Sequence, residues 1–164
     1  MKILILSDSH ASLRFMRLAM DIVRPNAVVH LGDHYDDARA LAEEYPQTPF
    51  HMVPGNCDRF RMHTWQPEML CYDVCGVRLY MTHGHLQGVK SGLSRLLAEG
   101  RKYEAAAVLY GHTHVADCRW EDDLWVVNPG SCGSAGGSVA VMETENGKIT
   151  ACRILRLAEL EETL

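Results

Sequence analysis

Acidic, histidine and asparagine side chains gather at five points of this 164-residue chain, each directly after a short apolar run. The clusters are Asp8-Ser9-His10, Gly32-Asp33, Gly55-Asn56-Cys57-Asp58, His83-Gly84-His85 and Gly111-His112-Thr113-His114. Carboxylate oxygens combined with neutral imidazoles suit Mn, Fe, Co, Ni or Zn better than a purely oxygen-ligated Mg. Any one of these residues alone is more simply a cap, a turn residue or a packed side chain. Their coincidence predicts a metal centre.

The number of candidate ligands matches a centre with two metal ions. Two ions about 3.5–4 Å apart need roughly four protein ligands each, with at least one bridging carboxylate. Glycines beside the candidate ligands allow the backbone to turn sharply and to approach the ions closely. Such a pair acidifies a bound water, so metal-assisted hydrolysis is the chemistry that this inventory indicates.

The segments that position these residues alternate between strand and helix in the first third of the chain. This alternation predicts a parallel sheet with crossover helices, and the carboxyl ends of its strands form one rim. The remainder is mostly β, so the sum is a mixed two-sheet α/β sandwich flanked by helices, in one domain over residues 1–164. The predicted strands are 2–6, 27–31, 50–53, 70–74, 77–82, 105–110, 115–121, 124–127, 139–143 and 149–155. The predicted helices are 12–23 with Ser12 as its cap, 36–44 and 91–101.

The five motifs in this order resemble the calcineurin-like metallophosphoesterases, especially their small bacterial and archaeal phosphodiesterase branch, over nearly the whole chain. The resemblance implies two divalent metal ions, for which manganese is favoured and nickel, iron, cobalt and zinc also suit the ligands. It assigns one ion to Asp8, His10, Asp33 and His114. It assigns the other to Asp33, Asn56, His83 and His112, so that Asp33 bridges the two.

Four residues are expected to take part in catalysis: Asp33, Asn56, Cys57 and His85. Cys57 occupies the position at which the broader family has a histidine thought to protonate the leaving oxygen. A thiol with a pKa near about 8.5 is a poor general acid at neutral pH. The chain is therefore expected to favour diesters or activated esters over alkyl monoesters. His85 either lines the substrate pocket or supports a metal ligand, and the role of Asp58 stays open.

Two other functions compete with that of a phosphodiesterase. One is a phosphomonoesterase or nucleotide phosphatase that uses the same metals. The other is a protein-interaction scaffold, since a eukaryotic retromer subunit resembles this fold and uses it as a binding platform with a degraded site. The complete ligand set of this chain favours an enzyme.

Composition limits the partners and the location. The net charge of −5 and the absence of a basic run argue against nucleic-acid binding, so a small phosphoester is the expected partner. The N-terminal apolar run is too short for a secretion signal, and no run is long enough for a membrane helix. Six cysteines without a signal peptide are expected to be reduced, which favours the cytoplasm. The leucine- and glutamate-rich C-terminus packs on the body or on a second copy, which leaves a homo-oligomer open.

Overall fold

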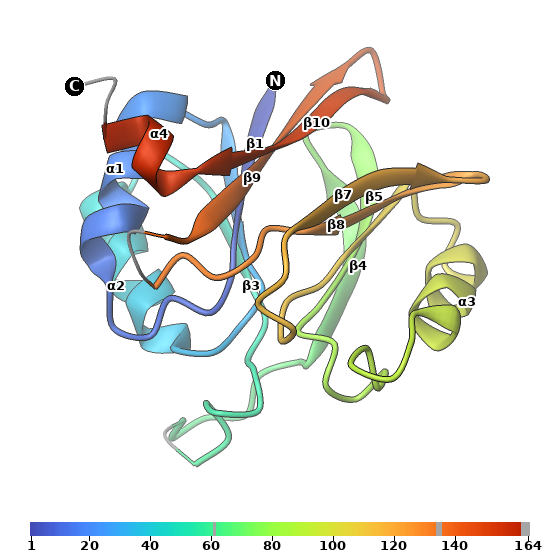
Figure 1. The fold of residues 1–164 in the computed structure, drawn as a ribbon, viewed down its shortest axis with the longest axis horizontal. Coiled ribbons are helices and arrows are strands. Elements are labelled where there is room, and N and C mark those ends of the chain that lie inside the picture. Colours follow the sequence, from blue (N-terminus) through green and yellow to red (C-terminus); the bar gives the residue numbers. More distant parts are fainter. Residues whose placement is uncertain (61, 134–135, 162–164) are drawn as a thin grey trace.

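The first of two central sheets carries the amino-terminal third of the chain. The computed structural model describes residues 1–60, 62–133 and 136–161. Helices lie on the outer sides of the two sheets (Figure 1). The first sheet has the strand order β10-β9-β1-β2-β3. Its strands are β1 (Lys2–Leu6), β2 (Ala27–His30), β3 (Phe50–Met52), β9 (Ser138–Glu145) and β10 (Lys148–Arg156).

The strands β1, β2 and β3 are parallel, as the sequence pattern predicts. Leu6 pairs with His30, and His30 pairs with Met52. The helices α1 (Leu13–Val23) and α2 (Tyr35–Glu44) make the crossovers. From Ile3 to Leu6, β1 has no exposed residue, because α1 packs on one of its faces and the second sheet on the other. The loops after these three strands therefore share one edge of the sheet.

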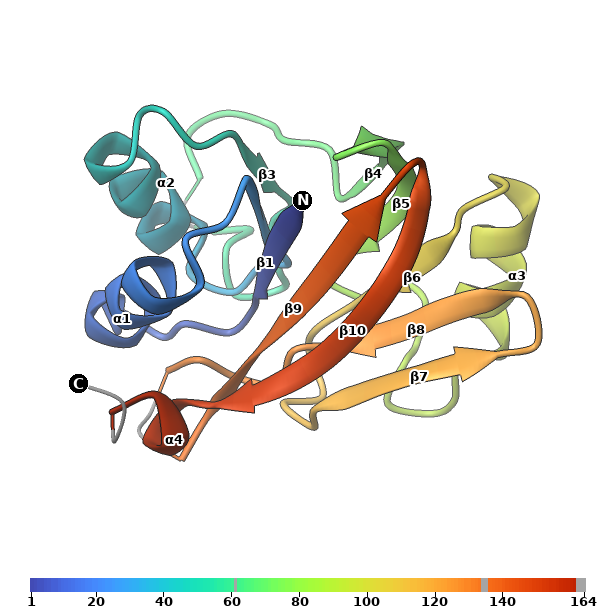
Figure 2. The same ribbon diagram turned by 90° about the horizontal axis from the view of Figure 1, so that it is seen from above.

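The second sheet has the strand order β4-β5-β6-β8-β7. Its strands are β4 (Met69–Val74), β5 (Val77–Thr82), β6 (Ala107–Leu109), β7 (Asp117–Glu121) and β8 (Leu124–Asn128). β4 and β5 form an antiparallel pair, whereas β5, β6 and β8 are parallel. Helix α3 (Ser94–Lys102) packs on this sheet, on the side of the molecule opposite to α1 and α2 (Figure 2). The predicted two-sheet mixed sandwich flanked by helices is thereby confirmed.

A continuous apolar core lies between the two sheets. It joins Ile5 and Val29 of the first sheet to Leu79 and Leu109 of the second, and all four are fully buried. Each such side chain contributes about 1.5–3 kcal/mol on burial. This packing fixes the edges of the two sheets relative to each other, so that the loops of one sheet can meet the loops of the other.

The differences from the predicted elements lie at their ends and have local causes. The helix predicted from Ser91 begins only at Ser94, because Gly92 has φ +146°, a conformation that interrupts a helix and that glycine tolerates. Ser12 occupies the N-cap position of α1, but its side chain makes no capping hydrogen bond. The strand predicted over residues 105–110 is shorter, from Ala107 to Leu109.

The C-terminal segment packs on the body through its apolar side. Helix α4 (Leu157–Glu161) buries Leu157 and Leu160 in the apolar cluster beneath α1. Residues 162–164, the end of the predicted amphipathic tail, lie outside the described residues. Among the helices that the structure describes, none has the length and apolar character that a membrane span requires.

Candidate metal centre

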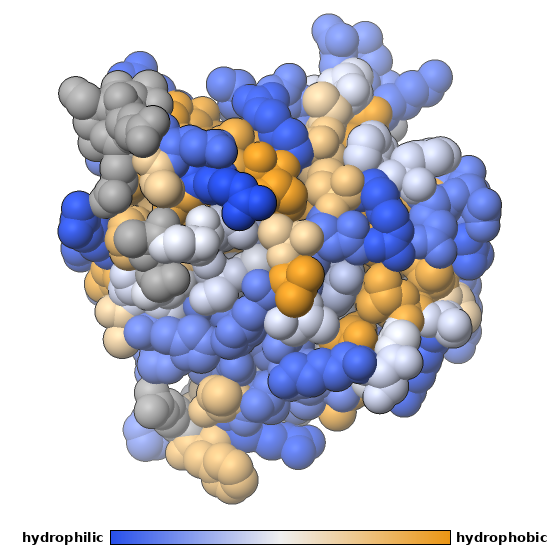
Figure 3. Space-filling view, viewed as in Figure 1, coloured by the Kyte–Doolittle hydropathy of each residue, from blue (hydrophilic) through white to orange (hydrophobic). Residues whose placement is uncertain are grey.

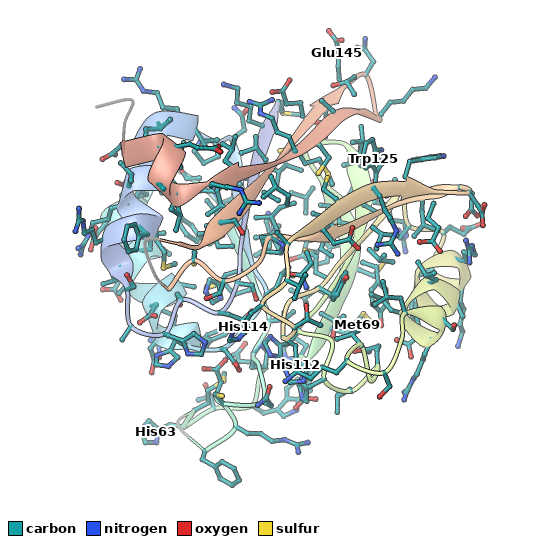
Figure 4. All side chains as sticks on the ribbon, viewed as in Figure 1. His63, Met69, His112, His114, Trp125 and Glu145 are labelled. Atoms are coloured by element: carbon teal, nitrogen blue, oxygen red, sulfur yellow. The ribbon has the colours of Figure 1, made fainter. Side chains whose placement is uncertain are left out.

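Loops from both sheets meet at one edge of the molecule. The first sheet contributes the loops after β1, β2 and β3, and the second contributes those after β5 and β6. His112 and His114 lie side by side at this edge, at the lower side of the molecule in Figure 4. The pairing of parallel strands explains the convergence, because each of these five strands ends in the same direction within its sheet.

Four of the expected ligands form one compact group. Asp8, His10, Asp33 and His114 each offer one ligand atom, and all of these atoms lie within 4.8 Å of one another. The Nε2 atoms of His10 and His114 are 3.5 Å apart. Both carboxylates are buried, whereas both histidines are exposed. The carboxylates therefore lie on the inner side of the group and the imidazoles on its solvent side.

The surroundings of Asp8 fit a cation. Its Oδ2 accepts hydrogen bonds from the Ser7 hydroxyl at 2.5 Å and from the His112 backbone N–H at 3.2 Å. Its Oδ1 is buried and accepts no hydrogen bond from the described part of the chain, although His114 Nε2 lies 3.0 Å away. A buried carboxylate oxygen without a partner is costly. A metal ion bound between these ligands would satisfy it, so the donor set suits the divalent ions that the sequence implies.

The remaining expected ligands gather around His83, which itself lies against Asp33. His83 Nε2 is 3.5 Å from Asp33 Oδ1 and 3.1 Å from Asn56 Oδ1. His83 Nδ1 lies 2.6 Å from the Leu31 carbonyl oxygen and donates its proton there, which leaves the Nε2 lone pair directed at Asp33 and Asn56. The rings of His83 and His112 have centroids 5.0 Å apart. Asp33 therefore contacts both groups of expected ligands.

The pKa shifts in this region favour the ligand forms of the side chains. Burial raises the pKa of Asp33, but the neighbouring His83 and a 3.0 Å hydrogen bond from the Cys57 backbone N–H outweigh it, so the net pKa is lowered. Burial and the proximity of His83 lower the pKa of His112 and that of His85. A carboxylate and neutral imidazoles are the states that bind metal.

Four of the expected ligands lie on strained backbone. Asp8, Asp33, His112 and His114 have φ angles of 53°, 55°, 68° and 59°, in the left-handed region that non-glycine residues seldom adopt. Neighbouring chain also comes very close: a Cβ added at Gly55 would lie 2.1 Å from Asp33 Oδ1. Strain of this kind persists only where surrounding contacts hold it, and it is common at functional sites.

A buried network behind the centre supplies part of this support. Gly32 N–H donates to His30 Nδ1 at 3.3 Å, so His30 Nε2 carries the proton and contacts the Ser9 hydroxyl at 3.3 Å. Ser9 in turn donates to Asp37 Oδ2 at 2.7 Å, and the Ala11 N–H donates to the same oxygen at 2.8 Å. Complete burial lowers the pKa of His30 to about 4, so the ring is neutral. The network ties the loop of Asp8 and His10 to α2.

Two further residues hold the loops of the expected ligands, and neither was predicted to do so from the sequence. Asp58 is buried and accepts hydrogen bonds from the N–H groups of Gly55 at 2.7 Å and Tyr35 at 2.9 Å. Asn128, at the end of β8, donates to the Gly111 carbonyl at 3.1 Å and to Thr113 Oγ1 at 3.0 Å. The sequence signals were available, since both residues follow strands, but apart from Gly55 their partners lie at least 15 residues away along the chain.

His85 and Cys57 border the centre. Both ring nitrogens of His85 are buried without a hydrogen-bond partner, and its ring centroid is 5.5 Å from that of His83. Burial and the hydrogen bond to Asp33 raise the pKa of the Cys57 thiol, so Cys57 is protonated at neutral pH. His34 also lies close, with its ring 5.3 Å from that of His10. His30, by contrast, is buried in β2.

Known proteins share both the sequence and the fold. The calcineurin-like phosphoesterase superfamily domain matches residues 1–147. A Methanocaldococcus jannaschii protein named a phosphodiesterase is 29% identical over 88% of this chain and 94% of its own length. A Streptococcus pneumoniae structure, described as a predicted phosphoesterase, has a TM-score of 0.76 and 26% identity over 96% of this chain and 90% of its own.

A more distant likeness concerns the fold alone. The structure of Vps29 from Entamoeba histolytica has a TM-score of 0.68 and 21% identity, and it covers 94% of this chain and 98% of its own. The match over residues 1–147 decides the family and confirms the expectation of a hydrolase of the phosphoesterase class. The chain belongs to the calcineurin-like phosphoesterase superfamily.

Proposed function

We propose that this chain hydrolyses phosphodiesters or activated phosphate esters at a centre that holds two divalent metal ions. One observation carries the proposal: Asp8, His10, Asp33 and His114 present four ligand atoms within 4.8 Å, and the buried Asp8 Oδ1 among them has no hydrogen bond. Manganese is the ion we favour, and nickel, iron, cobalt and zinc have ligand preferences that also suit carboxylate with imidazole.

The ligands divide into two sets that share one carboxylate. Asp33 supports this division because it belongs to the compact group and also lies 3.5 Å from His83 Nε2. We assign one ion to Asp8, His10, Asp33 and His114, and the other to Asp33, Asn56, His83 and His112. When bound, the ions would polarise the phosphoryl oxygens and acidify the attacking water.

The other polar groups of the site act on the substrate itself. Asn56 directs its Oδ1 at His83, and its Nδ2 lies 3.6 Å from Cys57 Sγ, at the exposed side of the centre. From there the amide can donate to an equatorial phosphoryl oxygen and neutralise charge that develops on it. We propose that His85 contacts the ester, since neither of its ring nitrogens has a hydrogen-bond partner among the residues that the structure describes.

Cys57 influences which leaving groups can depart readily from the substrate. Its raised pKa keeps the thiol protonated and makes it a weak acid, so it gives little help to a poor leaving oxygen. Esters whose leaving oxygen needs little protonation therefore fit this site best. The residue is thus part of the specificity for diesters and activated esters.

Substitution of Asp33 tests the metal centre. Asp33→Asn is expected to abolish metal loading and hydrolysis together, because the amide loses the charge and the bridging geometry of the carboxylate. Metal content is measured by inductively coupled plasma mass spectrometry. Turnover is measured as hydrolysis of bis(p-nitrophenyl) phosphate in the presence of each of several divalent cations. Asp36→Asn, at a residue with a 68% exposed side chain in α2, is the matched control. An Asp33→Asn protein with two metals and full turnover would refute the bridging role.

Two substrates that share the same leaving group test the preference for diesters over monoesters. Bis(p-nitrophenyl) phosphate is expected to give a higher kcat/KM than p-nitrophenyl phosphate. Cys57→His is expected to raise kcat/KM for the monoester and so to reduce the difference between the two substrates. If the monoester is the better substrate of the unmodified chain, the function is that of a phosphomonoesterase or nucleotide phosphatase.

A scaffold is the competing function, and the fold shared with Vps29 is the observation in its favour. Two bound metals without hydrolysis across a broad phosphoester panel would support it. Our proposal also includes a cytoplasmic location, which the six free cysteines support, and a single domain, which the core shared by both sheets supports.

A further inference from the structure

We propose that the segment between β3 and β4 binds the base of a nucleotide-type phosphoester, with Trp65 as the surface on which the base stacks. This inference rests on the proposed function, because it places the phosphate of the same ligand at the metal centre. The segment starts at the candidate ligand Asn56 and ends at β4, so one piece of chain joins the two sites.

The segment exposes two large aromatic side chains. Phe60 is 96% exposed and Trp65 is 85% exposed. His63 marks this segment in Figure 4, where it projects below the edge that carries His112 and His114. The space-filling view shows the same projection as a knob with a hydrophobic tip among hydrophilic neighbours (Figure 3). Aromatic side chains exposed to this degree near a catalytic centre are suited to stacking on a planar ligand.

A hollow of about 240 Å³ lies beneath Trp65. This volume is below the approximately 300–1,000 Å³ typical of sites for drug-sized ligands, so the hollow suits a single ring system. Its lining residues are Pro54, Arg59, Met62, His63, Thr64, Trp65, Gln66 and Glu68. The guanidinium, hydroxyl, amide and carboxylate groups among them supply the donors and acceptors that the polar edge of a base requires.

Glu68 connects this hollow to the metal centre. Its Oε2 lies 3.9 Å from His85 Nε2, and its Oε1 lies 3.5 Å from Arg59 Nε. A larger hollow of about 570 Å³ lies on the α2 side of the segment, with Tyr35, Asp36 and Arg39 among its lining residues. Neither lining includes an expected metal ligand, but the smaller hollow includes Glu68, which lies against His85 at the border of the metal centre, so it is the better candidate.

Two ligands that differ only by the base provide the test. Adenosine 5′-monophosphate and ribose 5-phosphate share the sugar and the phosphate. Their dissociation constants are measured by titration calorimetry on the manganese-loaded protein. We expect the nucleotide to bind about tenfold more tightly, the lower part of the range for stacking of one base on an aromatic side chain.

Variants locate the source of that advantage. Trp65→Ala is expected to bring the two dissociation constants together, and Trp65→Phe to keep most of the difference. The matched control is Trp120→Ala, because Trp120 is 57% exposed on β7, away from this segment. Since Trp65 is 85% exposed, its replacement should leave the melting temperature unchanged, and this is measured alongside.

Three results would overturn the inference. One is an equal affinity of the unmodified protein for both ligands, as expected if the segment binds a protein partner instead. Another is a base-dependent advantage that survives Trp65→Ala. If ribose 5-phosphate binds only with metal present, either result leaves the proposed function intact. The third is the failure of both phosphates to bind the metal-loaded protein, which would remove the proposed function as well.

Discussion

The edge that carries the expected ligands and the segment that follows Asn56 are neighbours in the chain but are built in opposite ways. At the edge, Asp8 and Asp33 are buried and tied to backbone and side chains by hydrogen bonds. In the segment, Phe60 and Trp65 are almost fully exposed. The contrast indicates that the chemistry requires fixed positions, whereas recognition of the substrate can be placed on a segment that changes without cost to the fold.

At the buried edge, Asp8→Asn is expected to have an effect on metal binding and turnover second only to that of Asp33→Asn. The amide removes the negative charge of this buried carboxylate, so one of the two proposed metal ions should be lost and kcat/KM should fall by at least about a hundredfold. Metal analysis and hydrolysis of bis(p-nitrophenyl) phosphate measure both. Asp73→Asn, on the exposed side of β4, is the control. Unchanged metal content with unchanged turnover would show that Asp8 is not a ligand.

The next effect concerns stability at the same edge. Asp58→Ala leaves the N–H groups of Gly55 and Tyr35 without their acceptor, which should lower the free energy of unfolding by about 2–4 kcal/mol. Urea denaturation of the metal-free protein measures it, with Asp73→Ala as the control. A loss below about 0.5 kcal/mol, the size typical of surface changes, would mean that water replaces the carboxylate.

A pH-dependent loss of stability is expected from the buried network. The pKa of His30 is lowered to about 4 in the folded chain, against 6.5 for an ordinary histidine. Between pH 6.5 and 4, His30 is therefore protonated in the unfolded chain but neutral in the folded chain. The free energy of unfolding falls as the pH drops through this range. The loss from His30 approaches about 3 kcal/mol.

Denaturation of the metal-free protein at pH 7 and pH 4.5 measures this loss. His85 and His112 also have lowered pKa values and add to it in the same direction. His30→Gln isolates the share of His30 and should make the pH dependence shallower. An identical dependence in the variant would contradict the role of His30.

The smallest effect is expected in the exposed segment. Phe60→Ser should change the free energy of unfolding by less than about 0.5 kcal/mol, because Phe60 is 96% exposed and buries almost nothing. Thermal denaturation measures it. A loss above about 1 kcal/mol would place Phe60 in a packed contact and remove the contrast between the two regions.

The sequence predicted the convergence of the ligand motifs for a physical reason. Each motif follows an apolar strand, and parallel strands end at one edge, so residues as distant as Asp8 and His114 are brought within reach. The supporting contacts were not predictable in this way. The hydrogen bonds of Asp37 to Ser9 and Ala11, and that of Asp58 to Tyr35, span 23 to 28 residues, and no local pattern reveals such partners. The start of α3 was missed because the interruption depends on the backbone of Gly92.

Because the expected ligands come from both sheets, an ion bound at this edge would link the two sheets at their interface. Asp8 and Asp33 follow strands of one sheet, and His83 and His114 follow strands of the other. The free energy of ion binding would then add to the cohesion of the domain, by about 2.7 kcal/mol for an ion at a hundred times its dissociation constant. Amide protons at the interface between the two sheets should exchange with solvent faster once a chelator removes the ions.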